Sequence, residues 1–176
     1  MAMARWLPAS GLCVGDLSEH PALAGIAVYA PATMRVTIEY RTDRALSADE
    51  FIDVLQRSTL AQRRPIHDRA CIEGMVKHAN LMVTGWDGAT LIGVARSVTD
   101  FSYACYLSDL AVDVQYQRTG IGRGLVSHTL KQLGPHCKIR LIAAPAAADY
   151  YAKIGFIQNV KCWELGHVAD VGSVFS

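Results

Sequence analysis

The sequence lacks a strong charge of either sign, a long apolar run and any C-x-x-C motif. Charged residues make up 19% of the 176 residues, and 17 Lys+Arg against 16 Asp+Glu leave a formal net charge of +1. This balance excludes a disordered, highly charged chain and gives no overall attraction to nucleic acid, so no nucleic-acid partner is expected. No uncharged apolar run approaches the roughly 18 residues that span a membrane, so we expect no membrane partner either.

The cysteines are odd in number and show no metal-ligand spacing. There are five, namely Cys13, Cys71, Cys105, Cys137 and Cys162. This number and spacing argue against a disulfide framework and against a zinc site, and the histidines likewise share no metal spacing. We interpret the cysteines as reduced, mostly packed thiols of a cytoplasmic protein without a metal.

Hydrophobic residues, in contrast, are abundant. They make up 51% of a chain whose length suits one domain with a sizeable core. Residues 34–176 are predicted to form that domain. Residues 1–33 hold three charges and no sustained periodicity, so they are expected to be a loosely ordered extension, in which Gly11 and Asp16 interrupt any signal-peptide core. A docked strand over residues 25–29 is the alternative.

Hydrophobic spacing from Met34 onward predicts a mixed α/β domain. The expected order is strand, two helices, three strands, helix, strand, helix and strand. Strands are expected at residues 36–41, 81–84, 91–95, 105–114, 139–143 and 157–165, and helices at 47–55, 68–79, 121–133 and 146–154. The second helix should turn Cys71 inward, and residues 139–143 suit a fully buried strand.

Short-range signals mark several ends of these elements. Ser47 and Glu50 form a capping-box pattern, and Asp68 is placed to start the second helix. The pair Asp87-Gly88 is a hairpin signal. Gly155 is expected to end the last helix in the left-handed conformation.

The run from Leu110 to Leu125 is the most informative segment, because a strand there passes through a glycine-rich turn into a helix. Glycines let the backbone approach a ligand closely, and a helix N-terminus carries positive partial charge, so the segment suits a phosphate or pyrophosphate. The dinucleotide pattern G-x-G-x-x-G fails, because its third glycine position, counted from Gly120, holds Leu125; the G-K-[ST] of a P-loop is missing as well. A loop that only caps a helix is the alternative.

A second segment narrows the choice to one family. The pattern Q-x-x-G-x-G, followed further along the chain by Y-x-x-x-G-F, stands on Gln117, Gly120 and Gly122 and on Tyr151, Gly155 and Phe156. In this order, the two motifs resemble the GNAT (GCN5-related N-acetyltransferase) superfamily over roughly residues 34–165. The resemblance implies an α/β (α+β) fold with a mixed, mostly antiparallel central sheet of six to seven strands, helices on both faces, and a splayed strand pair that forms the cofactor cleft.

The resemblance also implies acetyl-CoA as acyl donor and direct transfer of the acetyl group to an amine. The pantetheine arm would lie along the strand before the turn, and the pyrophosphate on the amides of the turn. The matching residues are Leu110, Ala111 and Val112 for the arm, and Gln117, Arg118, Thr119, Gly120, Ile121, Gly122 and Arg123 for the pyrophosphate. The side chains of Arg118 and Arg123 either add contacts to phosphates or are simply solvated.

The catalytic residues are also implied by the resemblance. Tyr151 matches the position from which many relatives protonate the departing thiolate; a packed aromatic that lines the cleft is the alternative. Tyr106 and Ser108 match positions that hold a base or its water in relatives, although neither is a good base. Strict alternation would place both on the face of Leu110, with Asp109 on the opposite face, where it would pair or cap.

The acceptor is expected to be a primary amine of a small molecule or a protein. Arg63 and Arg64 suit an anionic group on this acceptor, or form a solvated basic turn. The competing function is a CoA-binding regulatory protein of the same fold without turnover, which the missing base supports; a nucleotide-binding module unrelated to CoA is weaker. By analogy with relatives, residues 157–165 would pair across a homodimer.

Overall fold

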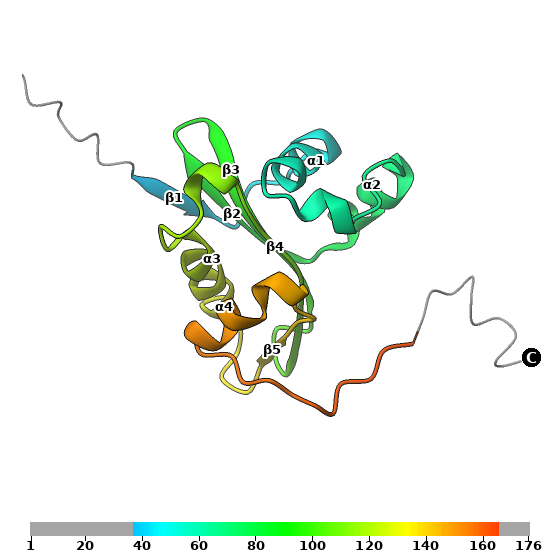
Figure 1. Cartoon of the computed structure of the whole chain (residues 1–176), viewed down its shortest axis with the longest axis vertical. Helices are drawn as coiled ribbons and strands as arrows, with labels where there is room; N and C mark the ends of the chain where they lie inside the picture. Colours follow the sequence, from blue (N-terminus) through cyan, green and yellow to red (C-terminus); the bar gives the residue numbers. More distant parts are fainter. Residues whose placement is uncertain (1–36, 166–176) are drawn as a thin grey trace, which may run out of the picture. The chain divides into compact units, whose positions relative to one another are not determined.

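The fold is centred on a five-stranded sheet, shown in the computed structural model of Figure 1, which describes residues 37–165. The sheet order is β1-β2-β3-β4-β5; neighbours from β1 to β4 run antiparallel, and β5 runs parallel to β4. The strands are β1 (Ile38–Arg41), β2 (Leu81–Asp87), β3 (Thr90–Thr99), β4 (Ala104–Val112) and β5 (Lys138–Arg140). The extension expected over residues 1–33 lies outside the described residues.

One face of the sheet is covered by the first two helices. These are α1 (Ala48–Arg57) and α2 (Arg69–His78), joined by the 3₁₀ turn η1 (Leu60–Arg63). Phe51, Val54 and Leu55 are fully buried and lie at the spacing that forms one face of a helix. They pack in one cluster with Ile72 of α2 and with the sheet residues Val94 and Ala111.

The predicted starts of both helices are confirmed. The Glu50 amide donates to Ser47 Oγ at 3.2 Å, and the Ser47 amide donates back to Glu50 Oε2 at 2.9 Å. Asp68 accepts from the Cys71 amide at 2.9 Å. The predicted burial of Cys71 is wrong, because α2 turns Ile72 into the core and leaves Cys71, one position round the helix, exposed.

The other face is covered by α3 and the segment around α4. Those elements are η2 (Val114–Tyr116), α3 (Ile121–Leu130), η3 (Pro145–Ala147) and α4 (Ala148–Lys153). Ile121, Leu125 and Val126 of α3 pack against Val83, Ile92 and Ala95 of the sheet. The helix ends three residues before the predicted Leu133, and Leu130 is 53% exposed.

Two predicted turns are confirmed. Gly88 follows β2 with φ +56°, and Asp87 pairs with Thr90, so the hairpin closes as expected. Gly155 follows α4 with φ +98°, a left-handed conformation that glycine adopts without a steric penalty.

The end of the chain differs from the prediction. No strand occupies residues 157–165, where the side chains of Ile157, Val160 and Trp163 are at least 90% exposed. The strand β5 is also short and far from fully buried, because Lys138 and Arg140 face solvent. The predicted class of fold is confirmed, but within the described residues the sheet has five strands rather than six to seven.

Candidate active site

The strands β4 and β5 separate after a short stretch of pairing. Their pairs are Ala104 with Lys138, Cys105 with Ile139, and Tyr106 with Arg140. Beyond Tyr106, no described strand pairs with this side of β4, which continues to Val112. This edge therefore has no strand partner among the described residues and is available to an extended ligand, as in binding by strand addition, although the Ser108 and Val112 carbonyls already accept from Arg64 and Gln117.

A cleft of about 90 Å³ lies at this point of separation. Its lining residues come from η1 and the residue after it, from β4, from the segment after β5, and from α4: Leu60, Arg63, Arg64, Leu107, Ser108, Leu110, Leu141, Ile142, Ala144, Ala147 and Tyr151. Five residues singled out in the sequence thus line the same cleft, namely Arg63, Arg64, Ser108, Leu110 and Tyr151. Tyr106 does not line it and is 44% exposed.

A β-bulge at Ser108 changes the faces of β4. Arg96 pairs with Asp109 and Ser97 with Leu107, which leaves Ser108 as the extra residue. As a result, Leu107 packs in the α3 cluster whereas Ala111 packs in the α1 cluster. The strict alternation assumed from the sequence was therefore wrong: Tyr106 lies on the face of Asp109, not on the face of Leu110.

The bulge gathers charged groups that are far apart in the sequence. Asp109 has a fully buried carboxylate that accepts from Arg64 Nε through Oδ1 and from Arg96 Nε through Oδ2. Arg64 Nη2 donates to the Ser108 carbonyl at 2.8 Å, and Arg96 Nη2 donates to Ser108 Oγ at 2.6 Å. Pairing of Asp109 was expected, but its partners were not found. The available signal was a carboxylate inside an apolar strand, which requires a buried cation.

Tyr151 reaches the cleft from α4. Its ring makes edge-to-face contacts with Phe156 and Tyr150, both with centroids 5.5 Å apart. Burial raises the pKa of Tyr151 above its ordinary value, nearby Tyr150 raises it further, and the cation of Arg64 opposes the shift. The phenol is thus kept protonated at neutral pH, as a proton donor requires.

The glycine-rich turn follows β4 and the short 3₁₀ turn η2. Arg118 and Gly120 have φ of +65° and +94°, and this left-handed backbone is costly for arginine but not for glycine. Gln117 Nε2 donates to the Val112 carbonyl at 3.0 Å and so holds the turn against the end of β4. The first amides of α3 have no acceptor within the helix, so they are available to an anion.

Aromatic residues beside α3 were missed in the sequence. The hydroxyl of Tyr40 lies over Gly124, where a side chain would collide with it. The Tyr40 ring stacks on His128 with centroids 4.4 Å apart, and His128 Nδ1 lies 2.9 Å from the Gly124 carbonyl oxygen. The packing of Tyr40 therefore favours a residue without a side chain at position 124.

Other candidates lie away from the cleft. Glu73 on α2 pairs with Arg69 at 2.9 Å on the surface, and Cys105 is buried with its thiol pKa raised by burial. Within residues 37–165, no three His, Cys, Asp or Glu side chains converge as a metal site would require. In the same range, no helix combines the length and the apolar character needed to cross a membrane.

The chain matches the family model described as an acetyltransferase (GNAT) domain over residues 49–165. Because this match covers more than half of the 176 residues, the chain belongs to the GNAT acetyltransferase family. The family resemblance inferred from the glycine turn and the Tyr151 motif is confirmed.

Sequence relatives carry names of the same kind. The uncharacterized N-acetyltransferase ycf52 of Gracilaria tenuistipitata var. liui is 30% identical over 100 residues, which cover 55% of this chain and 55% of that protein. The ycf52 protein of Porphyra purpurea is 28% identical over 90 residues, covering 48% of this chain and 52% of that one. The chain thus spans about half the length of these curated relatives.

Solved structures show the same fold. A GNAT-family acetyltransferase from Streptococcus pneumoniae has a TM-score of 0.62 at 19% identity, covering 75% of this chain and 98% of that one. An aminoglycoside acetyltransferase from an uncultured soil metagenomic sample, in complex with sisomicin, has a TM-score of 0.52 at 18% identity, covering 74% and 94%. At such identities the likeness concerns the fold alone.

Proposed function

We propose that this protein is an N-acetyltransferase that moves the acetyl group of acetyl-CoA to a primary amine by direct attack. The observation that carries the proposal is the open edge of β4, which begins where β5 departs and runs beside the cleft that Tyr151 lines. Family membership supports the same reaction.

The donor would bind along β4 and the turn after it. The pantetheine arm would pair with the backbone of Leu110, Ala111 and Val112, and the pyrophosphate would accept hydrogen bonds from the amides between Gln117 and Arg123. The exposed guanidinium groups of Arg118 and Arg123 are available for charge-assisted contacts with the phosphates.

The reaction needs one nucleophile and one acid. The lone pair of a neutral amine attacks the thioester carbonyl carbon, and the Val112 amide stabilises the resulting oxyanion. The C–S bond then breaks, and the departing thiolate takes the Tyr151 proton, which solvent restores. The amine loses its extra proton to water held near Ser108, whose Oγ already accepts from Arg96 and can direct its own proton outward. Tyr106, exposed beside the cleft, is the other group able to hold such a water.

Release of free thiol from acetyl-CoA in the presence of pooled amines tests this function. Calorimetry with CoA, NAD and ATP tests the binding site separately, and binding of CoA alone is expected. CoA binding without thiol release from any amine would contradict the transferase proposal and favour the regulatory, non-catalytic alternative. Cytoplasmic location and a homodimer remain proposals from the sequence.

A further inference from the structure

The charges around the cleft point to the class of acceptor. Its lining carries two arginines, Arg63 and Arg64, and no carboxylate. Its other walls are largely aliphatic and come from Leu60, Leu107, Leu110, Leu141 and Ile142. An acceptor that enters this cleft therefore meets positive charge and apolar surface.

Asp109 does not offset this positive charge for a ligand. Its side chain has no exposed surface, and its two carboxylate oxygens are engaged by Arg64 and Arg96. A polycationic amine would thus find no acidic group in the lining to bind, and it would be repelled by the arginines.

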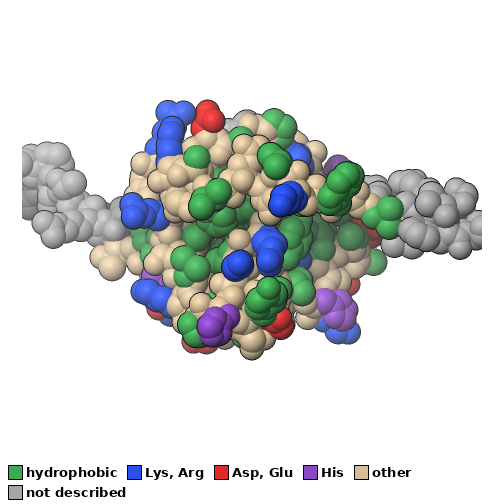
Figure 2. All heavy atoms as spheres, turned by 90° about the horizontal axis from the view of Figure 1, so that it is seen from below, with side chains coloured by type: hydrophobic (Ala, Val, Ile, Leu, Met, Phe, Trp, Pro, Cys, Tyr) green, Lys and Arg blue, Asp and Glu red, His purple; other side chains and the backbone are tan. Residues whose placement is uncertain are grey.

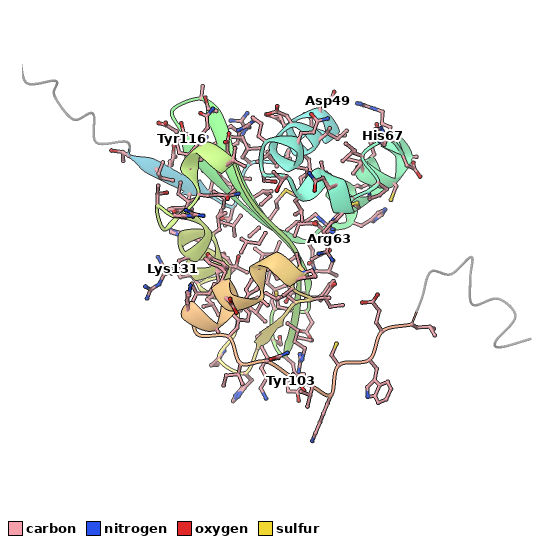
Figure 3. All side chains as sticks on the ribbon, in the orientation of Figure 1. Asp49, Arg63, His67, Tyr103, Tyr116 and Lys131 are labelled. Atoms are coloured by element: carbon pink, nitrogen blue, oxygen red, sulfur yellow. The ribbon has the colours of Figure 1, made fainter. Side chains whose placement is uncertain are left out.

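The two arginines of the cleft differ in their freedom. Arg64 is committed through its contacts with Asp109, with the Ser108 carbonyl and with the Arg63 carbonyl at 2.8 Å. Arg63 is exposed, and its guanidinium forms no ion pair with any residue from 37 to 165. Figure 3 labels Arg63 in the region between the α1 and α2 helices and α4, and Arg63 is one of the residues that line the cleft.

Beyond the cleft, the sheet face is uncovered and presents a row of exposed residues. Val98 pairs with Tyr106, and Tyr106 with Arg140, so the three side chains lie side by side across β3, β4 and β5. Val98 and Tyr106 are 48% and 44% exposed. Figure 2, which views the molecule from below the view of Figure 1, shows basic side chains set among hydrophobic ones and acidic side chains near the outline.

We propose that the acceptor is an amine that carries a carboxylate and an apolar or aromatic body, as an amino acid does. Arg63 binds the carboxylate through two parallel hydrogen bonds, and the body lies over Tyr106 and its neighbours. Only the amino end enters, because the cleft of about 90 Å³ has room for few atoms beside the acetyl group. This inference rests on the proposed transferase function.

Matched acceptors test the inference. Thiol release would be measured with L-phenylalanine, L-phenylalanine amide and phenethylamine, and with L-leucine and 3-methylbutylamine. The wild-type protein should favour L-phenylalanine and L-leucine over the matched compounds without a carboxylate by at least about tenfold in kcat/KM, which corresponds to about 1.4 kcal/mol. Arg63→Gln should bring that ratio close to one, mainly by raising KM for the carboxylates. Lys131→Gln removes the same charge from the end of α3, outside the cleft, and should leave the ratio unchanged.

A binding measurement separates this inference from the proposed function. L-phenylalanine and its amide would be titrated into the CoA-saturated protein, wild type and Arg63→Gln. Tighter binding of the acid that depends on Arg63, without thiol release from any of the pooled amines, would support a carboxylate site at Arg63 and refute the transferase function. Equal binding of L-phenylalanine and its amide, or no binding of either compound, would overturn the inference. Thiol release that is equally efficient with and without the carboxylate would overturn it too, and would leave the transferase function standing.

Discussion

The hydroxyl of Tyr150 lies directly over the Cα of Gly122, at the start of α3. A Cβ added at Gly122 would collide with that oxygen and would lie 3.3 Å from the ring carbon that bears it. Burial raises the pKa of this phenol, and nearby Arg123 opposes the shift. Gly122 therefore has two reasons to lack a side chain: the proposed approach of the pyrophosphate and the observed packing of Tyr150.

A substitution at Gly122 distinguishes the two reasons. Gly122→Ala is expected to weaken CoA binding by about tenfold or more, because the methyl group stands where the backbone must approach the pyrophosphate. Titration calorimetry measures the dissociation constant. In the double variant Gly122→Ala/Tyr150→Phe, the oxygen of the collision is gone, so binding should stay weak if the phosphate is the cause. Recovery of wild-type affinity in that double variant would mean that the glycine serves Tyr150 alone.

Tyr151→Phe tests the proposed acid. The change keeps the ring and its contact with Phe156, so the fold and CoA affinity should survive, while kcat falls by roughly 10²-fold or more, on the scale of one general acid. Steady-state kinetics with acetyl-CoA give kcat and KM separately. Tyr150→Phe is the matched control, because its hydroxyl lies at α3 and not in the cleft lining. A Tyr151→Phe enzyme with wild-type kcat would reduce Tyr151 to a wall of the cleft.

The pH dependence of kcat should follow the Tyr151 phenol. Burial raises its pKa, so the acid stays protonated through neutral pH. The value of kcat should therefore fall only at a pH above about 10, the ordinary pKa of tyrosine. Arg64 lowers this pKa, so Arg64→Gln should move the alkaline limb to higher pH. Arg123→Gln changes the surroundings of Tyr150 instead, so the alkaline limb of the kcat profile should stay at the wild-type pH when acetyl-CoA is saturating. A shift to lower pH in Arg64→Gln would contradict the assignment.

Asp109→Ala should strongly destabilise the protein. Removing the carboxylate leaves Arg64 and Arg96 without their shared partner next to a buried strand, at a cost of about 3–5 kcal/mol. Urea unfolding followed by circular dichroism measures the loss. Asp49→Ala breaks the surface pair with Arg69 and should leave the urea midpoint where it is, because exposed pairs contribute little. Similar midpoints for both variants would show that the buried cluster adds no stability.

Sequence reasoning succeeded where the physical cause is local. The capping box of Ser47 and Glu50 spans four residues, and the left-handed Gly155 lies just after the end of its helix, so both could be predicted without the rest of the chain. The glycine turn and the Tyr151 motif identified the family for the same reason, since each is a short pattern. The predicted strand over residues 157–165 shows the limit, because apolar residues there satisfy a strand pattern without any described strand to pair with.

The sequence by itself thus determined the class of fold, the starts of the early helices, and the residues of the turn and of the Tyr151 motif. Only the tertiary structure decided which face of β4 each side chain occupies, because the bulge at Ser108 arises from pairing with β3. It also decided the partners of Asp109, which lie 45 and 13 residues away along the chain. Contacts over such separations depend on how strands and helices pack together, and no local pattern of residues encodes that packing.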